Sequence, residues 1–148
     1  MKKILCYIII FSSTTLAKTN HFQNAFMSFD LPDRWQCHLD GTEWVCKSDS
    51  ENRAKEAVIV LTAKEAGPTD SLGAYIDHLN APITSKTNSG QTITSKVSIP
   101  PKQNLINDQI WVEGQHLHGE VPNFVTHYFA TVKDKVAVLV TYSAHKDV

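Results

Sequence analysis

The sequence contains no long hydrophobic run. Its longest apolar stretch covers residues 4–11, whereas a helix that spans a bilayer needs roughly 20 apolar residues. No later stretch is long and apolar enough to span a membrane, and neither heptads nor internal repeats occur. We therefore expect no stable membrane insertion.

An excess of basic residues is also lacking. The chain has 14 Lys and Arg against 15 Asp and Glu, which gives a formal net charge of −1. A surface that binds phosphate backbones needs a clearly basic balance. Nucleic acid is therefore excluded as an expected partner.

The motifs that mark common catalytic sites are missing too. We find no Gly-x-Ser-x-Gly elbow and no glycine-rich phosphate loop. Paired carboxylates for glycoside hydrolysis can come from anywhere in a fold, and nothing in the sequence nominates a pair. We expect a non-catalytic protein without a cofactor, and an enzyme stays open as the alternative.

The amino terminus has the three parts of a secretory signal peptide. Lys2 and Lys3 precede the apolar stretch 4–11, and Thr15 and Ala17 supply small residues before a cleavage site. Cleavage after residue 17 leaves 131 residues, enough for one domain, with a formal charge of −3. We expect an exported protein, periplasmic or secreted.

Cysteine is scarce, and the two that remain after cleavage are placed to pair. If Gly41 and Thr42 form a two-residue turn, the strands around them bring Cys37 directly opposite Cys46. An even cysteine count in an exported protein favours a disulfide. Two separate buried thiols, or a redox-active pair, are the competing interpretations. A redox pair usually has Cys-x-x-Cys spacing, which is absent here.

The rest of the chain predicts mostly strands with one helix. Leu72, Tyr75, Ile76 and Leu79 recur with helical spacing. We expect a flexible segment at 18–23 and a single domain at 24–148. Within it, the pattern predicts strands at 26–31, 57–63, 92–99 and 110–118, a helix at 70–80 capped by Thr69 or Asp70, and a mobile loop at 83–91. Residues 57–63 are apolar apart from Thr62, as in a central strand, and Pro100 and Pro101 are expected to end the strand before them.

The clearest hairpin joins strands 124–132 and 136–144 through residues 133–135. This connection predicts one shared core face, made by Phe124, Tyr128, Val132, Val136, Val138, Val140 and Tyr142. The final strand then lies at a sheet edge, or the natural chain is longer. The predicted class is α+β: a mostly antiparallel sheet with one clear helix packed on it, and a β-sandwich as the alternative.

Residues 29–35, Phe-Asp-Leu-Pro-Asp-Arg-Trp, resemble the opening of the PsbP-like superfamily and of DcrB-type exported bacterial proteins, roughly Phe-x-Leu-Pro-x-Gly-Trp. The resemblance implies an α/β/α sandwich around an antiparallel sheet and a non-enzymatic accessory or assembly role. The chain departs from this pattern at Arg34, where glycine is usual, and in lacking the final helix. No site residue is implied by the motif.

Two sets of side chains are candidate sites. His116 and His118 lie two apart, which on a strand puts both imidazoles on one face, and His127 or Glu120 could complete a metal site. Exposed strand histidines are the competing interpretation, because only one close pair of ligands exists. Trp44 and Trp111 mark a partner surface if they are exposed, although most tryptophans are core residues.

The sequence thus predicts a non-catalytic accessory or binding domain of the bacterial envelope. It is expected to act through contacts with an envelope protein or a small ligand. The alternative is a metal-dependent or carboxylate hydrolase that uses His116, His118 and a nearby acid.

Overall fold

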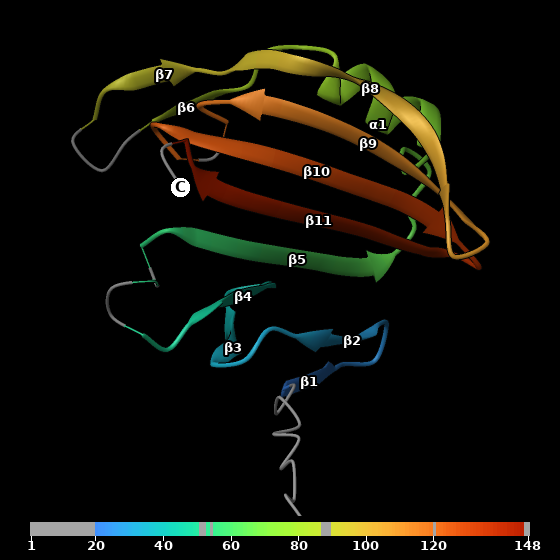
Figure 1. The fold of residues 1–148 in the computed structure, drawn as a ribbon. Coiled ribbons are helices and arrows are strands. Elements are labelled where there is room, and N and C mark those ends of the chain that lie inside the picture. Colours follow the sequence, from blue (N-terminus) through green and yellow to red (C-terminus); the bar gives the residue numbers. More distant parts are fainter. Residues whose placement is uncertain (1–19, 51–52, 54, 87–89, 120, 147–148) are drawn as a thin grey trace, which may run out of the picture.

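A computed structural model describes residues 20–146 except 51–52, 54, 87–89 and 120 (Figure 1). The expected signal peptide, residues 1–17, lies outside the described residues. Within the described part, strands β3-β4-β5-β11-β10-β9-β8, in that spatial order, form an antiparallel sheet that we call the main sheet. The pairs β1-β2 and β6-β7 form separate hairpins. The element bounds are β1 Asn20–Gln23, β2 Ser28–Leu31, β3 Trp35–Asp40, β4 Glu43–Ser48, β5 Ala57–Glu65, α1 Leu72–Leu79, β6 Thr84–Lys86, β7 Thr92–Thr94, β8 Lys96–Ile106, β9 Gln109–Leu117, β10 Phe124–Lys133 and β11 Val136–His145.

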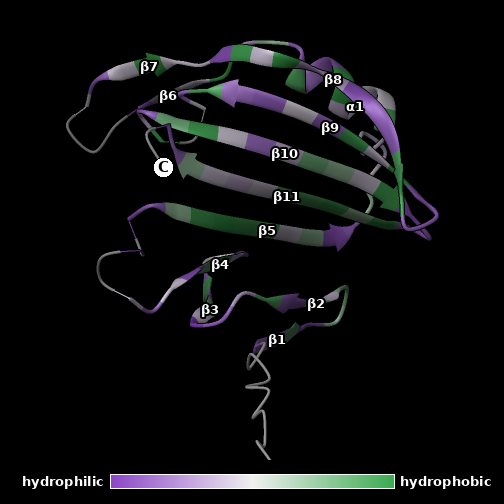
Figure 2. Ribbon diagram, viewed as in Figure 1, coloured by the Kyte–Doolittle hydropathy of each residue, from purple (hydrophilic) through white to green (hydrophobic). Residues whose placement is uncertain are grey.

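The centre of the main sheet is formed by β5 and β11. Most of β5 is hydrophobic and its carboxyl end is hydrophilic (Figure 2). This composition suits a strand with neighbours on both sides and cover on both faces, so the prediction of a central strand at 57–63 is confirmed. The final strand, β11, lies between β5 and β10. The expectation that it lies at a sheet edge is therefore wrong.

The two faces of the main sheet have different cover. Successive strand residues point to opposite faces, and Leu139 and Val140 of β11 belong to different hydrophobic clusters. Leu139 packs with α1 on what we call the helix face. Val140 packs with the β1-β2 hairpin on the opposite face, which we call the groove face.

The helix forms where the spacing predicts it. The Ser71 side chain caps it by accepting a hydrogen bond from the Ala74 backbone N–H at 3.1 Å, so Thr69 and Asp70 are not the caps. The apolar stripe of α1, with Leu79 fully buried, packs against Val112 and Tyr128 on the helix face. One helix on an antiparallel sheet confirms the α+β class and not the β-sandwich.

The segment expected to be flexible is partly a strand. Asn20–Gln23 pairs with Ser28–Leu31 to form the β1-β2 hairpin. Phe22 is buried in this hairpin and contacts Trp44 and Phe29, with ring centroids 5.1 Å away in each case. The polar residues around Phe22 concealed this single apolar anchor, which ties the segment to the main sheet.

Two other expectations were wrong for local reasons. Strand β8 continues through Pro100 and Pro101, because it is an edge strand whose pairing with β9 shifts register between Val97 and Lys102. An edge strand with such irregularities tolerates residues that cannot donate a hydrogen bond. The predicted loop 83–91 contains β6, which pairs with β7; residues 87–89 lie outside the described part.

The β10-β11 hairpin has a two-residue turn rather than a three-residue one. Lys133 pairs with Val136, and the turn residues Asp134 and Lys135 both have positive φ. The predicted register paired Val132 with Val136, and a shift of one residue moves a whole strand to the other face. The predicted shared face is therefore split: Phe124, Tyr128 and Val132 lie on the helix face, whereas Val136, Val138, Val140 and Tyr142 lie on the groove face.

Candidate functional site

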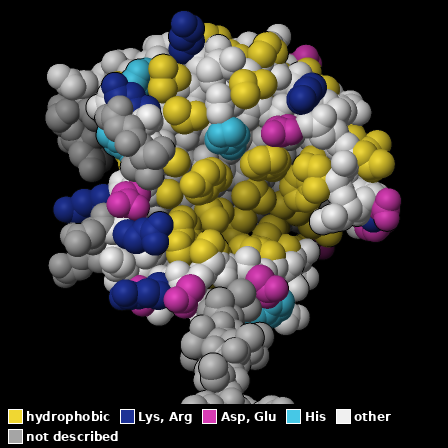
Figure 3. Space-filling view, viewed as in Figure 1, with side chains coloured by type: hydrophobic (Ala, Val, Ile, Leu, Met, Phe, Trp, Pro, Cys, Tyr) yellow, Lys and Arg dark blue, Asp and Glu magenta, His cyan; other side chains and the backbone are white. Residues whose placement is uncertain are grey.

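An open groove of about 640 Å³ lies on the groove face, between the β1-β2 hairpin and the main sheet. A space-filling view shows hydrophobic side chains gathered over the middle of this face, with charged side chains around them (Figure 3). Strands β5 and β11 supply the floor, the hairpin supplies one wall, and β9 with the β8-β9 turn supplies the other. The residues that line the groove are Phe26, Met27, Ser28, Phe29, Ile59, Leu61, Asn107, Gln109, Trp111, Thr131, Lys133, Asp134, Val136, Val138 and Val140.

The hairpin wall is held at both of its ends. At the open end, the Asn20 side-chain amide donates a 2.9 Å hydrogen bond to the Trp35 carbonyl oxygen of β3. At the tip, the Asn24 carboxamide oxygen accepts from the backbone N–H groups of Phe26 and Met27. This local bonding fixes the turn and leaves Phe26 at the rim with 44% of its surface exposed.

The groove has a polar, charged end beside the β8-β9 and β10-β11 turns. There the Gln109 side-chain amide donates to the Thr131 hydroxyl oxygen at 2.5 Å, and that hydroxyl donates to the Ile110 carbonyl oxygen at 2.6 Å. Lys133 and Asp134 border the same end. The site therefore changes from an aliphatic floor to a hydrogen-bonding, charged end.

The two candidate tryptophans have different surroundings. Trp111 is half-buried and lines the groove. Trp44 packs edge-on against Phe22 in the cluster below the hairpin. Trp44 therefore supports the wall of the groove and does not itself line it.

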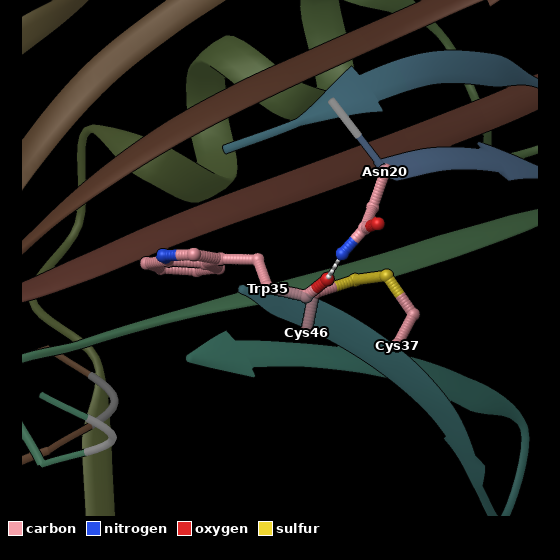
Figure 4. Close-up of a disulfide and its surroundings, with 4 residues drawn as sticks. All are labelled: Asn20, Trp35, Cys37 and Cys46. Atoms are coloured by element: carbon pink, nitrogen blue, oxygen red, sulfur yellow. Dashed lines mark hydrogen bonds between the residues drawn. A yellow bond between two sulfur atoms is a disulfide. The ribbon is translucent and has the colours of Figure 1, made fainter. Parts of the chain in front are cut away.

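The disulfide between Cys37 and Cys46 is present and links β3 to β4 (Figure 4). The register of the hairpin is the predicted one, with Cys37 opposite Cys46 and Asp40 opposite Glu43. Cys46 is fully buried in the same cluster as Phe22. The bridge fixes the edge of the main sheet against which the β1-β2 hairpin rests.

The histidines are not brought together. His116 is fully buried on the helix face, where its Nε2 donates to the Leu79 carbonyl oxygen at 2.8 Å and its Nδ1 lies 3.0 Å from the Ser95 hydroxyl. His118 follows the end of β9 with positive φ, and its Nδ1 accepts from the Asn123 N–H. His127 lies on the groove face, where it pairs with Gln115 of β9. His116 pairs with Thr126, and successive strand residues such as Thr126 and His127 point to opposite faces.

This arrangement does not resemble a metal centre. Among the described residues, no three His, Cys, Asp or Glu side chains lie close enough to hold a metal ion, and Glu120 is outside the described part. Both ring nitrogens of His116 have protein partners. The histidine joins β9, the end of α1 and the segment before β8, which is a structural role.

A polar cluster next to α1 contains two groups with shifted pKa values, Asp70 and Tyr75. The Asp70 carboxylate accepts from the Gly67 N–H and the Tyr75 hydroxyl and lies 2.9 Å from the Lys64 Nζ. These contacts, the Gly67 hydrogen bond first, lower the pKa of Asp70. Burial, and then the Asp70 charge, raises the pKa of Tyr75 to about 12. The cluster ties the end of β5 to α1 and is not in the groove.

Most of the groove residues could not be found from the sequence. The sequence marks Trp111 as part of a partner surface if it is exposed, but Met27, Lys133 and Val138 come from three distant segments. The alternation of Val136, Val138 and Val140 was a usable signal. The predicted register instead puts these valines on the same face as Tyr128.

The fold and the groove define the class of protein: an α+β domain whose antiparallel sheet has a helix on one face and an apolar groove on the other. No helix in the described part is long and apolar enough to cross a membrane. No family model matches the chain, and no curated protein does.

Among solved structures, the chain is similar to cyanobacterial PsbP (CyanoP) from Synechocystis. The TM-score is 0.59 at 12% identity, covering 92% of this chain and 85% of that one. The PsbP-like fold suggested by residues 29–35 is therefore present, and at this identity the likeness concerns the fold alone. The resemblance to DcrB-type proteins stays a prediction. A structure from Bacteroides thetaiotaomicron gives a TM-score of 0.44 at 10% identity, covering 80% of this chain and 38% of that one, and contributes no argument.

Proposed function

We propose that this chain is an exported, non-catalytic binding domain that holds a small apolar ligand in the groove. The observation behind the proposal is the groove itself, about 640 Å³ in volume and lined mainly by aliphatic and aromatic side chains. Sites for small molecules usually measure about 300–1,000 Å³ and combine apolar walls with a few polar groups. The groove has both properties without any rearrangement of the chain.

Side-chain placement favours binding over chemistry. The polar groups at the groove end are engaged with one another, as in the contacts from Gln109 to Thr131 and from Thr131 to the Ile110 carbonyl. The hydrolase alternative needs His116 beside His118 and an acid, and His116 instead lies on the helix face with both nitrogens engaged. No observation favours that alternative, and we do not propose it.

Export is supported by the sequence pattern of residues 1–17 and by the Cys37–Cys46 disulfide. Disulfides persist in oxidising compartments such as the periplasm and the extracellular space. The PsbP-like fold is compatible with an accessory role. We therefore place the ligand outside the cytoplasm, in the envelope or the medium.

Titration with the apolar dye N-phenyl-1-naphthylamine tests the proposal. The protein, residues 18–148 with its disulfide intact, should increase the dye's fluorescence with saturable binding. Trp111→Ala should weaken binding roughly tenfold, because truncating a central aromatic contact typically costs more than 1 kcal/mol. Phe26→Ser, which alters only the exposed rim, should weaken it by a smaller factor.

Leu105→Ser is the matched control. Leu105 is 71% exposed and is not among the residues that line the groove, so its truncation should leave dye binding unchanged. Circular dichroism should show that all three variants remain folded. Equal dye affinity in wild type, Trp111→Ala and Phe26→Ser would show that the groove is not the binding site.

A further inference from the structure

The groove has a charged end and an aliphatic floor, and this difference indicates which class of ligand it binds. Lys133 is the last residue of β10 and pairs with Val136. Directly opposite residues of an antiparallel pair share a face, so Lys133 projects on the groove face, in line with Val136, Val138 and Val140. A lysine thus stands at the end of an aliphatic track.

The ammonium group of Lys133 is also free to form an ion pair with a ligand. It forms no ion pair with any residue that the structure describes. The acid nearest in sequence, Asp134, borders the same end of the groove, but no ion pair joins it to Lys133. An ammonium group at a groove end without an ion-pair partner complements a negative charge on the ligand.

We propose that the ligand is a free single-chain aliphatic carboxylate, of the fatty-acid type. Its alkyl chain lies along Val136, Val138 and Val140, and its carboxylate lies at Lys133. This inference rests on the proposed function, because it names the ligand class of the same groove. An aliphatic ligand with one charged group matches a groove with one charged end.

The direction of the ligand follows from solvation. A carboxylate placed among the aliphatic floor residues would lose its hydration without gaining a partner, which is strongly unfavourable. At the turn end the carboxylate stays in contact with solvent and gains Lys133, while each methylene group buried on the floor adds to the hydrophobic stabilisation of the complex. The alkyl chain therefore supplies most of the affinity, and Lys133 supplies the preference for an anion.

The test compares dodecanoate with dodecanol, both below the concentration at which they aggregate, by displacement of N-phenyl-1-naphthylamine. Wild type should bind dodecanoate more tightly than dodecanol at low ionic strength. Lys133→Gln should weaken dodecanoate binding roughly threefold to fivefold, the size expected for a solvent-exposed ion pair, and leave dodecanol unchanged. Asp134→Asn should strengthen dodecanoate binding, because it removes a nearby like charge.

Lys135→Gln is the matched control. It removes the same charge two residues away, at a side chain that does not line the groove, and dodecanoate affinity should stay as in wild type. Three results would overturn the inference: equal wild-type affinity for the two ligands, an equal loss of both in Lys133→Gln, or binding to anionic vesicles without binding to monomeric dodecanoate. If both ligands bind equally, the apolar groove stands as the site and only the carboxylate assignment fails. If neither displaces the dye, the proposed function fails with it.

Discussion

At the scale of single residues, three side chains determine how the groove wall is held. Phe22 inserts between Phe29 and Trp44, and these contacts rest on the strand pair that the Cys37–Cys46 bridge closes. Cys46 has no exposed surface. The disulfide therefore stabilises the edge of the main sheet on which the wall depends.

Replacing both cysteines, Cys37→Ala with Cys46→Ala, should lower the free energy of unfolding by about 2–3 kcal/mol. The bridge closes a short loop, with the two cysteines nine positions apart, and loop-closure entropy gives a value of this size. Urea unfolding with and without dithiothreitol measures it. Reductant should lower the wild-type midpoint to that of the double variant and leave the midpoint of the variant unchanged. A wild-type midpoint that is the same with and without reductant would contradict the prediction.

The cysteine pair was predictable and the histidines were not, for one reason. Cys46, the partner of Cys37, lies only nine positions away across a two-residue turn, and turn geometry is local. The partners of His116 are Ser95 and the Leu79 carbonyl, which lie 21 and 37 positions away. Such contacts depend on how α1 docks on the main sheet, and no local pattern specifies that.

At the scale of elements, α1 is attached to the main sheet through more than its apolar stripe. The Asp70 carboxylate connects the Gly67 N–H, the Lys64 ammonium and the Tyr75 hydroxyl. Lys64 belongs to β5 and Tyr75 to α1. One carboxylate thus joins a central strand to the first turns of the helix.

Asp70→Asn should destabilise the protein near neutral pH, and the difference from wild type should shrink in acid. The folded state lowers the pKa of Asp70 below its ordinary value of 3.8. A group with a lowered pKa stabilises the fold above its unfolded pKa and loses that contribution as the pH falls through the folded pKa. Thermal unfolding at a series of pH values measures the difference between the two proteins.

Asp77→Asn is the control for this prediction, since Asp77 is an acid on α1 that lies outside the Asp70 cluster. Its unfolding midpoint should follow that of wild type across the series. A gap between wild type and Asp70→Asn that is constant from neutral to strongly acidic pH would contradict the account. It would mean that the lost stability does not come from the ionised carboxylate.

Element types were more predictable than element register. The helix, the central strand and the cysteine hairpin follow from apolar spacing and from glycine at a turn. The β10-β11 hairpin was predicted as a pair of strands, but Lys133 pairs with Val136 rather than lying in the turn. Asp134 and Lys135 both adopt positive φ, and neither is the glycine that usually announces such a turn.

At the scale of the whole molecule, the groove arises because the two faces of one sheet are covered unequally. The helix packs over β8, β9 and β10 on the helix face. On the groove face the β1-β2 hairpin covers Leu61 and its neighbours, and leaves Val136 and Trp111 bordering open space. The uncovered apolar surface is what a ligand can bury.

The groove as a unit could not be predicted from the sequence. Its walls come from the β1-β2 hairpin, which lies in a segment expected to be partly flexible, and from a turn more than 75 positions further along the chain. Its floor requires Val138 and Val140 on the face opposite Tyr128. Only the assembled sheet brings these residues together.

The most direct test of the central claim is an isotope-filtered nuclear Overhauser experiment on the protein with bound dodecanoate. The account predicts contacts from the ligand's methylene protons to the methyl groups of Ile59, Val138 and Val140, which lie on the groove face. It predicts none to Val58 or Val60, which alternate with Ile59 on the helix face. Contacts to Val58 and Val60 without contacts to Val138 and Val140 would contradict the account.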